Sequence, residues 1–536
     1  MFGGISTKRI KMSKIKLKLF FITSLINLFA FGFESNAQKP QKDFLITNYG
    51  SKADGKTINT LAIQKAIDAA FKNKGGRVVF PKGNFLSGSI ILKSNVTLYF
   101  EEGSVLLGST NPEDYPNMSF EGRPDSPKKD DNSQMALIIA HKAKNIALKG
   151  KGIIDGQGLQ LALNIDSLHH AGIAVDPKYS LRRNRPNETM RPKLFRFSQC
   201  ENITIEGLKA GEASCWGLSF ELCNNLVLDN LKIVNRSYWN NDGIDITDCK
   251  NVKVTNCDIN AADDGICLKS YYPGFYNDSV YIANCTIRSS ASAIKFGTAS
   301  FGGFKNVIIN DIKVYDTFRS AIAIESVDGA LIENIEVSNI NAINTGNAIF
   351  IRLGQRTGDK PGTIKNVSLK NIKVQVPFGR PDSNYDLRGP EVDFFHNPFP
   401  SSIVGLKGHN VENVILENIE INYPGRASKG MAYIPLNRLH QVPEAAQDYP
   451  EFSMFGELPA YGLYVRHANG ISMKNIKLTL DDADFRPAFI FDDVQNVNMK
   501  EINLPEAKHK QIVFKNVISS TLENQLLEQK LEIEGK

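Results

Sequence analysis

A short phrase recurs along this chain and constrains its fold more than any other feature. Each copy begins with Asn and continues with Val, Ile, Leu or Met at alternate positions. Such alternation over four to six residues is typical of β-strands, and no long helical pattern separates the copies. Many short strands at a regular spacing favour a solenoid, in which each coil buries its apolar side chains against the next. The copies begin at Asn95, Asn202, Asn225, Asn251, Asn306, Asn366, Asn413 and Asn496.

A second phrase recurs once per repeat, as the first does, and it predicts which side chains face outward. It starts with Gly or Ala, and its second and fourth positions are always apolar. Because strand side chains alternate in direction, these positions point inward and the third and fifth point outward. The outward positions then form rows of charged and aromatic side chains, as binding of an extended polar polymer requires. Copies start at Gly217, Gly243, Gly265, Ala293, Ala321, Ala348 and, after insertions, Gly462.

The first 37 residues have the pattern of a secretory signal peptide. Basic residues up to Lys18 precede the apolar run from Leu19 to Phe33, and small residues around Ala37 offer a cleavage site. The run is shorter than the ~18 apolar residues that usually span a bilayer. We therefore expect residues 1–37 to be removed and the protein to be exported, periplasmic or extracellular, without insertion into the membrane.

Charge and cysteine usage exclude several classes of protein. Beyond residue 37 the basic and acidic side chains are nearly equal in number, which argues against a nucleic-acid-binding protein. All 7 Cys lie between Cys200 and Cys285, with spacings that match no metal-binding pattern. We expect buried thiols stacked in the core, with disulfides as the alternative.

One early segment differs from the strand pattern. Residues 60–71 have apolar side chains at helical spacing, and a Lys-Gly-Gly stop follows. This helix would cover the open end of the solenoid. We expect one β-helix domain over residues 38–520, followed by a charged tail over 521–536.

Motifs near the start of the domain resemble the polygalacturonase family of glycoside hydrolases, which are right-handed parallel β-helix enzymes of the pectin-lyase-like superfamily. The matching stretches are Asn48-Tyr-Gly-Ser-Lys-Ala-Asp-Gly, Gly75-Gly-Arg-Val-Val-Phe-Pro and Gly152-Ile-Ile-Asp-Gly-Gln-Gly. The resemblance extends from about residue 43 to 500. It implies an all-β, right-handed parallel β-helix with an N-terminal capping helix.

Two acidic motifs of that family match on adjacent repeats. Asn240-Asn241-Asp242 matches its Asn-x-Asp motif, and Asp263-Asp264 matches its paired aspartates. The resemblance implies that Asp263 is the general acid and that Asp242 and Asp264 position water. Glycoside hydrolysis needs such a pair of carboxylic groups, and crowding raises the pKa of at least one of them. Read without the resemblance, Asn-Asp-Gly and Asp-Asp-Gly are also ordinary turn sequences.

Two other motifs of the family are replaced. The repeat places Ala291-Ser292-Ala293 where the family has Gly-His-Gly, and Ala323 and Glu325 where it has Arg-x-Lys. Other side chains must then contact a uronate. The candidate substrate-binding residues are Asp245, Lys269, Lys295, Arg319, Glu325, Arg352, Tyr464 and Arg466, and Tyr271 and Tyr272 are candidates for stacking on sugar rings.

We expect an inverting, exo-acting glycoside hydrolase that degrades a uronic-acid-containing poly- or oligosaccharide without a cofactor or metal ion. Insertions over 377–400 and 423–461 would close one end of the groove. The first alternative is a lyase or dehydratase in which a lysine such as Lys295 removes a proton and β-elimination follows. The second is a β-helix that binds carbohydrate without cleaving it. The sequence does not indicate an oligomeric state.

Overall fold

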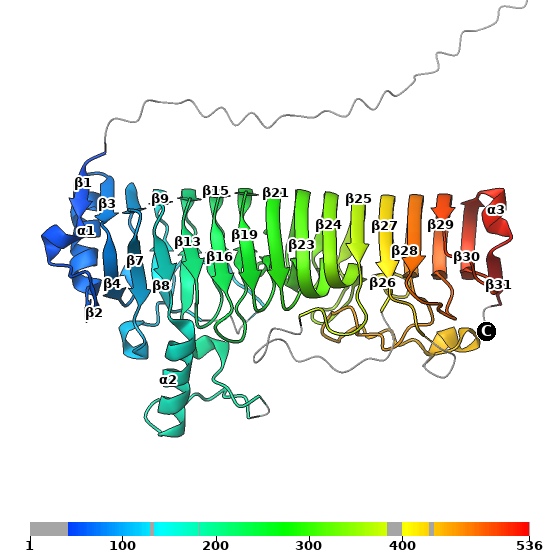
Figure 1. Cartoon of the computed structure of the whole chain (residues 1–536), viewed down its shortest axis with the longest axis horizontal. Helices are drawn as coiled ribbons and strands as arrows, with labels where there is room; N and C mark the ends of the chain where they lie inside the picture. The colour runs from blue at the N-terminus through cyan, green and yellow to red at the C-terminus, as the bar shows by residue number, and fades with distance from the viewer. Residues whose placement is uncertain (1–40, 129–132, 182, 383–398, 428–433, 535–536) are drawn as a thin grey trace, which may run out of the picture. The chain divides into compact units, whose positions relative to one another are not determined.

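The strands stack in parallel, coil upon coil, in a β-helix (Figure 1). The computed structural model describes residues 41–128, 133–181, 183–382, 399–427 and 434–534, and the architecture below is that of the compact unit Lys42–Lys536. The predicted signal peptide lies outside the described residues. Within the described part of the chain, no helix is long and apolar enough to cross a membrane.

The first row of paired strands contains the Asn phrases. Its neighbours align in register along the stack, for example Ile203 with Leu226 and Leu226 with Val252. The separate strands of this row are β1 (Asp43–Leu45), β3 (Gly76–Phe80), β6 (Val96–Phe100), β9 (Lys144–Gly150), β12 (Glu201–Glu206), β15 (Asn224–Asp229) and β18 (Lys250–Thr255).

The second row follows the first after a bend in each coil. Its separate strands are β2 (Asp54–Ile58), β4 (Gly83–Ser87), β7 (Ser104–Gly108), β10 (Ile153–Asp155), β13 (Lys209–Gly211), β16 (Lys232–Asn235) and β19 (Asp258–Ala261).

The third row contains the Gly/Ala phrases and carries the candidate site. Its separate strands are β5 (Ile90–Ile91), β8 (Ala136–His141), β11 (Lys193–Ser198), β14 (Leu218–Glu221), β17 (Ile244–Thr247), β20 (Ile266–Ser270), β22 (Ile294–Ser300), β26 (Ser401–Val404) and β31 (Lys530–Ile533).

Later in the chain, single long strands bend from one row into the next. They are β21 (Asn277–Ser289), β23 (Gly303–Ser326), β24 (Leu331–Leu353), β25 (Thr363–Gln375), β27 (Val411–Tyr423), β28 (Leu463–Leu480), β29 (Phe489–Asn503) and β30 (Ile512–Leu522). The sequence alignment placed Phe350 and Tyr464 in consecutive copies of the phrase. In the structure β26 lies between them, since Phe350 pairs with Ser402 and Ser402 pairs with Tyr464.

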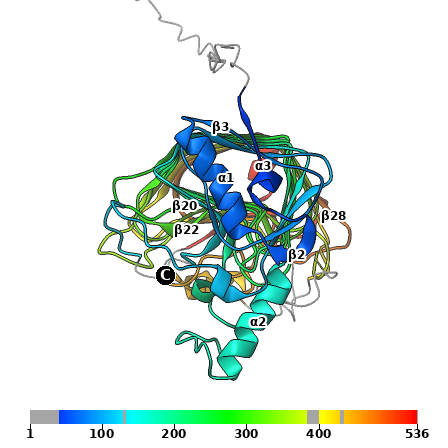
Figure 2. The same cartoon turned by 90° about the vertical axis from the view of Figure 1, so that its left-hand side faces the viewer.

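Helices are few and lie outside the coils. They are α1 (Thr60–Lys72), α2 (Gly158–His170) and α3 (Asn524–Leu527), with short 3-10 helices η1 (Ile46–Tyr49), η2 (Pro112–Asp114), η3 (Glu188–Met190) and η4 (Leu436–Gln441). The predicted first helix is confirmed: α1 buries Ile63, Ala66, Ile67 and Ala70 and lies across the first coil (Figure 2). At the other end β31 pairs with β30, so parallel pairing continues beyond the boundary expected at residue 520.

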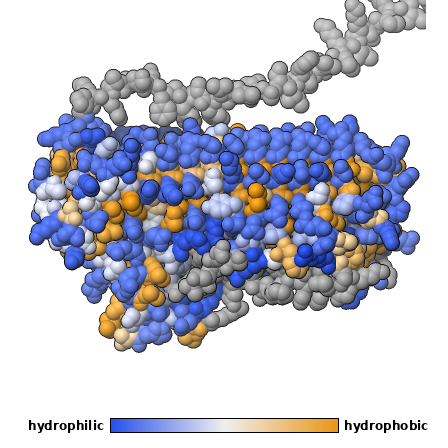
Figure 3. All heavy atoms as spheres, viewed as in Figure 1, coloured by the Kyte–Doolittle hydropathy of each residue, from blue (hydrophilic) through white to orange (hydrophobic). Residues whose placement is uncertain are grey.

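The core runs through the interior of the coils. Inward positions of the Gly/Ala phrase such as Leu218, Ile244, Ile266 and Phe296 are fully buried in one apolar cluster, as the alternation predicted. Outside the core, the face seen in Figure 3 is largely hydrophilic, with a band of apolar side chains along the stacked strands. All seven Cys are free, buried thiols, which confirms the expectation of core packing over disulfides.

Outward positions of the Gly/Ala phrase are covered rather than exposed. Asp245, Cys267, Lys295 and Ala323 form one register row along β17, β20, β22 and β23, and none is more than 2% exposed. We expected an open face of ordered side chains. Tyr449, from a loop distant in sequence, contacts Lys295 of this row instead, and the row is largely desolvated.

Candidate active site

The acidic motifs occupy equivalent places on adjacent coils. Asp242 ends the turn before β17, and Asp263 and Asp264 end the turn before β20. The Gly243 amide donates to the Asp264 carbonyl at 2.9 Å, which locks the two turns together. A Cβ at Gly243 would lie only 2.5 Å from the Gly265 carbonyl oxygen, so the glycine permits this close approach.

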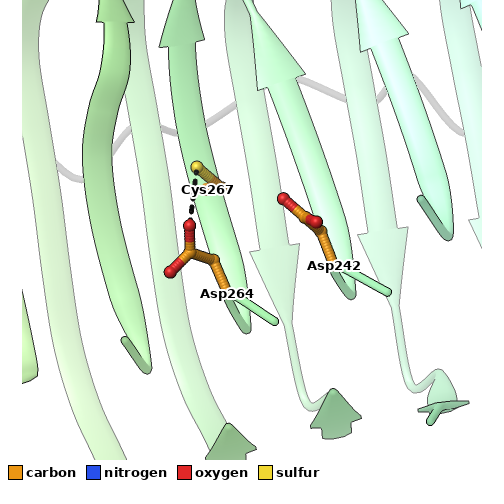
Figure 4. A group of neighbouring side chains, drawn as sticks. All are labelled: Asp242, Asp264 and Cys267. Carbon is orange, nitrogen blue, oxygen red and sulfur yellow. Dashed lines mark hydrogen bonds between the residues drawn. The ribbon is translucent and has the colours of Figure 1, made fainter. Parts of the chain in front are cut away.

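Two of the three predicted catalytic acids lie side by side, beside the thiol of Cys267 (Figure 4). One ligand atom from each of Asp242, Asp264 and Cys267 lies within 4.8 Å of the others. Asp242 and Asp264 are 3% and 4% exposed, whereas Asp263 is only partly buried. Asp263 is therefore the member of the trio most open to a substrate.

Two lysines, one on β20 and one on β22, form ion pairs with these acids. Lys269 Nζ lies 3.1 Å from Asp242 and 2.9 Å from Asp245, the fully buried acid of β17. Lys295 Nζ lies 3.4 Å from Asp264 and 3.9 Å from Glu325. The structure thus brings the predicted residues Asp245, Lys269, Lys295 and Glu325 to the three aspartates.

The acids differ in proton affinity. Burial raises the pKa of Asp263 to about 7, and the charges of Asp242 and Asp264 act in the same direction. Burial would also raise the pKa of Asp264, but the charges of Lys295, Lys269 and Arg319 lower it below its usual value. Asp263 therefore retains a proton to a higher pH than Asp264 does, as an acid and base pair requires.

Lys269 and Lys295 remain charged. Burial alone would lower the pKa of each amine, but Asp245 and neighbouring acidic groups raise that of Lys269, and Asp264 and Glu325 raise that of Lys295. A protonated amine cannot accept the proton that β-elimination removes. Because both amines are also ion-paired with carboxylates, they are poorly placed to act as the base of the lyase alternative.

The cluster of Asp242, Asp264 and Cys267 is poorly suited to a metal ion. Burial raises the pKa of the Cys267 thiol well above its usual value, so its deprotonation by a bound metal ion would be costly. Lys269 Nζ already lies 3.0 Å from Cys267 Sγ and 3.1 Å from Asp242. A cation placed between these ligands would have to displace that ammonium group.

The replaced motifs also line the site. The Ser292 amide, where the resemblance expects histidine, donates to Asp264 Oδ1 at 3.1 Å. Glu325, where it expects a cation, is 1% exposed, and burial raises its pKa to about 7 despite the opposing charge of Lys295. Ser292 thus orients Asp264 by a hydrogen bond, and Glu325 shares Lys295 with Asp264.

A segment distant in sequence completes the site. Lys295 Nζ donates to Tyr449 Oη at 3.1 Å, and Arg319 forms an ion pair with Glu451 at 3.2 Å. Both partners belong to the insertion predicted over 423–461. Sequence reasoning identified the insertion but not these two residues, because no repeat position relates them to the strands.

Arg352, Tyr464 and Arg466 lie apart from the acids and hold the insertion in place. Tyr464 is fully buried in a second apolar cluster beneath the insertion, with residues such as Phe350. Arg352 donates to the carbonyls of Gly405, Glu444 and Ala445, and Arg466 donates to that of Val442. We predicted substrate contacts for these three residues; their placement supports a structural role instead.

Comparison with known proteins relates this geometry to a family. Residues 77–380 match the family model described as glycosyl hydrolases family 28. An exo-poly-alpha-D-galacturonosidase of Dickeya chrysanthemi is 26% identical over 448 residues, covering 70% of this chain and 71% of that protein. A probable polygalacturonase of Vitis vinifera is 24% identical over 389 residues, covering 70% and 69%.

Solved structures share the fold. The family 28 exopolygalacturonase of Yersinia enterocolitica superposes with a TM-score of 0.62 at 20% identity, over 87% of this chain and 78% of that one. An exopolygalacturonase of Thermotoga maritima gives 0.59 at 20% identity, over 82% and 93%. Since the family model covers more than half of its length, the chain belongs to glycosyl hydrolases family 28 and is a glycoside hydrolase.

Proposed function

We propose that this enzyme hydrolyses a galacturonate-containing polysaccharide or its oligosaccharides, with inversion and from a chain end. The observation that carries the proposal is the meeting of Asp242 and Asp264 from adjacent coils, each held by a lysine, with the more accessible Asp263 next to Asp264 in the chain. Burial raises the pKa of Asp263 to about 7, whereas neighbouring cations lower the pKa of Asp264. The substrate class rests on the names of the relatives, which include an exo-poly-alpha-D-galacturonosidase.

In this mechanism Asp263 donates its proton to the glycosidic oxygen as the bond to the leaving sugar breaks. Asp264 accepts a proton from a water molecule that attacks the opposite face of the sugar, and Asp242 helps to position that water. The attacking water requires space, so inverting enzymes separate acid and base by ~6.5 to 9.5 Å. Lys269 and Lys295 hold Asp242 and Asp264 through ion pairs and limit their movement.

Action at a chain end is supported by the insertion. Tyr449 and Glu451 contact Lys295 and Arg319 directly, so the segment that carries them bounds the site on the side of the later coils. A groove closed on one side admits the end of a chain more readily than its middle. Export of the enzyme, which the first 37 residues predict, stays a prediction.

Replacing Asp263 tests the mechanism. Asp263→Asn should lower kcat by about a thousandfold or more, since an amide cannot supply the proton to the leaving oxygen. Reducing ends released from polygalacturonate measure the activity, and circular dichroism checks the fold. Asp258→Asn, on the exposed surface of β19, is the matched control and should keep full activity.

Near-normal turnover by Asp263→Asn would contradict the assignment of the acid. Formation of unsaturated uronate, detected by its ultraviolet absorbance, would replace hydrolysis with elimination.

A further inference from the structure

The turn that carries Asp242 is longer than its counterpart on the next coil. Residues 236–243 connect β16 to β17, whereas residues 262–265 connect β19 to β20 and carry Asp263 and Asp264. A longer connection has more conformations available to it, so fixing its position costs more entropy. Asp242 must nevertheless lie beside Asp264, and the contacts that hold its turn in place therefore affect the geometry of the acids.

Two asparagines attach this turn to the rest of the coil. Asn241, fully buried, donates from Nδ2 to the carbonyls of Ala213 at 2.8 Å and Cys215 at 2.6 Å. Asn235, which ends β16, donates from Nδ2 to the carbonyl of Asp242 at 2.8 Å. These bonds hold the end of the turn and do not involve its middle.

The middle of the turn is held by Arg191, a fully buried residue. Its Nη1 donates to the carbonyls of Trp239 and Ser214, each at 2.6 Å, and its Nη2 donates to Asn240 Oδ1 at 2.7 Å. The guanidinium group also lies 5.1 Å from the centre of the Tyr238 ring. One planar group with a fixed arrangement of donors thus joins the preceding coil to three consecutive residues of the turn.

The burial of Arg191 is not explained by core packing. In the described part of the chain, the hydrogen bonds of its side chain all go to neutral oxygen atoms, which belong to Asn187, Ser214, Trp239 and Asn240. Burying a charge without a carboxylate partner costs free energy that an apolar side chain in the same place would not. The arrangement therefore points to a role in placing the turn.

A small shift of this turn would move Asp242 away from its partners. Asp242 follows Asn240 by two residues, and its carboxylate lies 3.1 Å from Lys269 Nζ and close to Asp264. A displacement of about 1 Å in a catalytic group can lower the rate about a hundredfold. Because Arg191 is fully buried, it acts on the reaction only through the turn.

We propose that Arg191 is a positioning residue of the catalytic reaction: through Trp239 and Asn240 it fixes the turn so that Asp242 stays beside Asp264. The assignment rests on the proposed function for the role of Asp242. It also explains the asparagine at position 240, which accepts a hydrogen bond from Arg191 and has a φ of 56°, in the left-handed region that Asn tolerates.

The first test separates turnover from binding and from stability. Arg191→Lys keeps the charge but cannot reach the same acceptors together, so it should lower kcat about thirtyfold and leave KM within about twofold. Lost stability alone would lower the melting temperature without changing the kcat of folded enzyme. Initial rates on tetragalacturonate, well below the melting temperature, measure both constants. Arg486→Lys, at a buried arginine before β29, is the matched control and should keep kcat.

A double-mutant cycle tests whether the effect passes through Asp242. Asp242→Asn should itself lower kcat, and adding Arg191→Lys should lower it by less than about threefold further, because the two changes disturb the same group. A second loss as large as that of Arg191→Lys alone would overturn the positioning role. An unchanged kcat in Arg191→Lys would overturn it as well.

A crystal structure of Arg191→Lys provides a measure that needs no substrate. The Asp242 carboxylate should lie about 1 Å from its place beside Asp264, and an unmoved carboxylate would overturn the proposal. If the unmodified enzyme releases no sugar from tetragalacturonate, the proposed function is wrong, and the displacement of Asp242 still tests the positioning.

Asn240→Gly covers the case in which Arg191→Lys does not fold. It removes one hydrogen bond to Arg191 and accepts the left-handed backbone, so it should lower kcat about fivefold at an unchanged KM. Wild-type kcat in Asn240→Gly would contradict the proposal.

Discussion

Single residues set both the bends of the coil and the chemistry of the site. The Asn that opens each phrase lies in the left-handed region, with φ of 58° at Asn202 and 57° at Asn366. Asn tolerates this conformation better than other residues that carry a side chain. Its side-chain amide also donates to the equivalent residue of the preceding coil, as Asn366 does to Asn334 Oδ1 at 3.2 Å.

Asn366 offers a test of this role. Asn366→Ala should lower the free energy of unfolding by about 1–2 kcal/mol, through backbone strain and loss of the side-chain hydrogen bonds. Asn366→Gly removes the same hydrogen bonds but accepts the backbone conformation, so it should cost less. Urea unfolding measures both. Equal losses would show that the left-handed conformation is not the cause.

The pH dependence of activity follows from the two acids. The active form needs Asp263 protonated and Asp264 ionised, so kcat/KM should fall as the pH rises above about 7. The acid limb should lie below about pH 4, because the pKa of Asp264 is lowered from an already acidic value. Initial rates between pH 3 and 9 measure the profile. A basic limb well below pH 6 would refute the assigned proton on Asp263.

At the scale of elements, the insertion behaves as a small second layer on the β-helix. It packs residues such as Leu439, Phe452 and Phe455 onto outward positions of the third row, where they form their own apolar cluster. Arg352, fully buried, ties the strand β24 to this layer through the carbonyl groups of Glu444 and Ala445. The layer in turn delivers Tyr449 and Glu451 to the catalytic cations.

Arg352→Ala should loosen this layer more than the coils. Two carbonyls of the layer, those of Glu444 and Ala445, lose their donor, which we expect to destabilise the layer by about 2 kcal/mol. Limited proteolysis should cleave within 434–461 faster, and kcat/KM should fall as Tyr449 and Glu451 lose their positions. Lys373→Ala, at an exposed position of β25, is the control. Wild-type protease resistance in Arg352→Ala would contradict this role.

Across the whole molecule, stability depends on closing both ends of the stacked strands. Helix α1 covers the first coil, and β31 with α3 covers the last, where β30 would otherwise present an unpaired edge. Such edges promote association with other chains.

Deleting residues 523–536 should therefore uncover β30 and cause self-association. Size-exclusion chromatography at several protein concentrations measures it, and a truncation after Glu534, which keeps β31, is the control. If the shorter variant elutes like the intact enzyme at every concentration, the exposed edge of β30 does not cause association, and this prediction is wrong.

The repeated phrases were sufficient to predict the solenoid, its inward residues and the stacking of Asp242 with Asp264. Those features depend on strand alternation and on register between coils, which are local and periodic and so can be read along the chain. Stacking at a fixed register then brings residues 22 positions apart into contact.

The tertiary structure decided the rest. Several features arise from loops that follow no period. They are the covering of the outward row, the partners Tyr449 and Glu451, and the structural placement of Tyr464 and Arg352. A loop's position is set by the surface on which it packs, so contacts between a loop and a strand become defined only when both are folded.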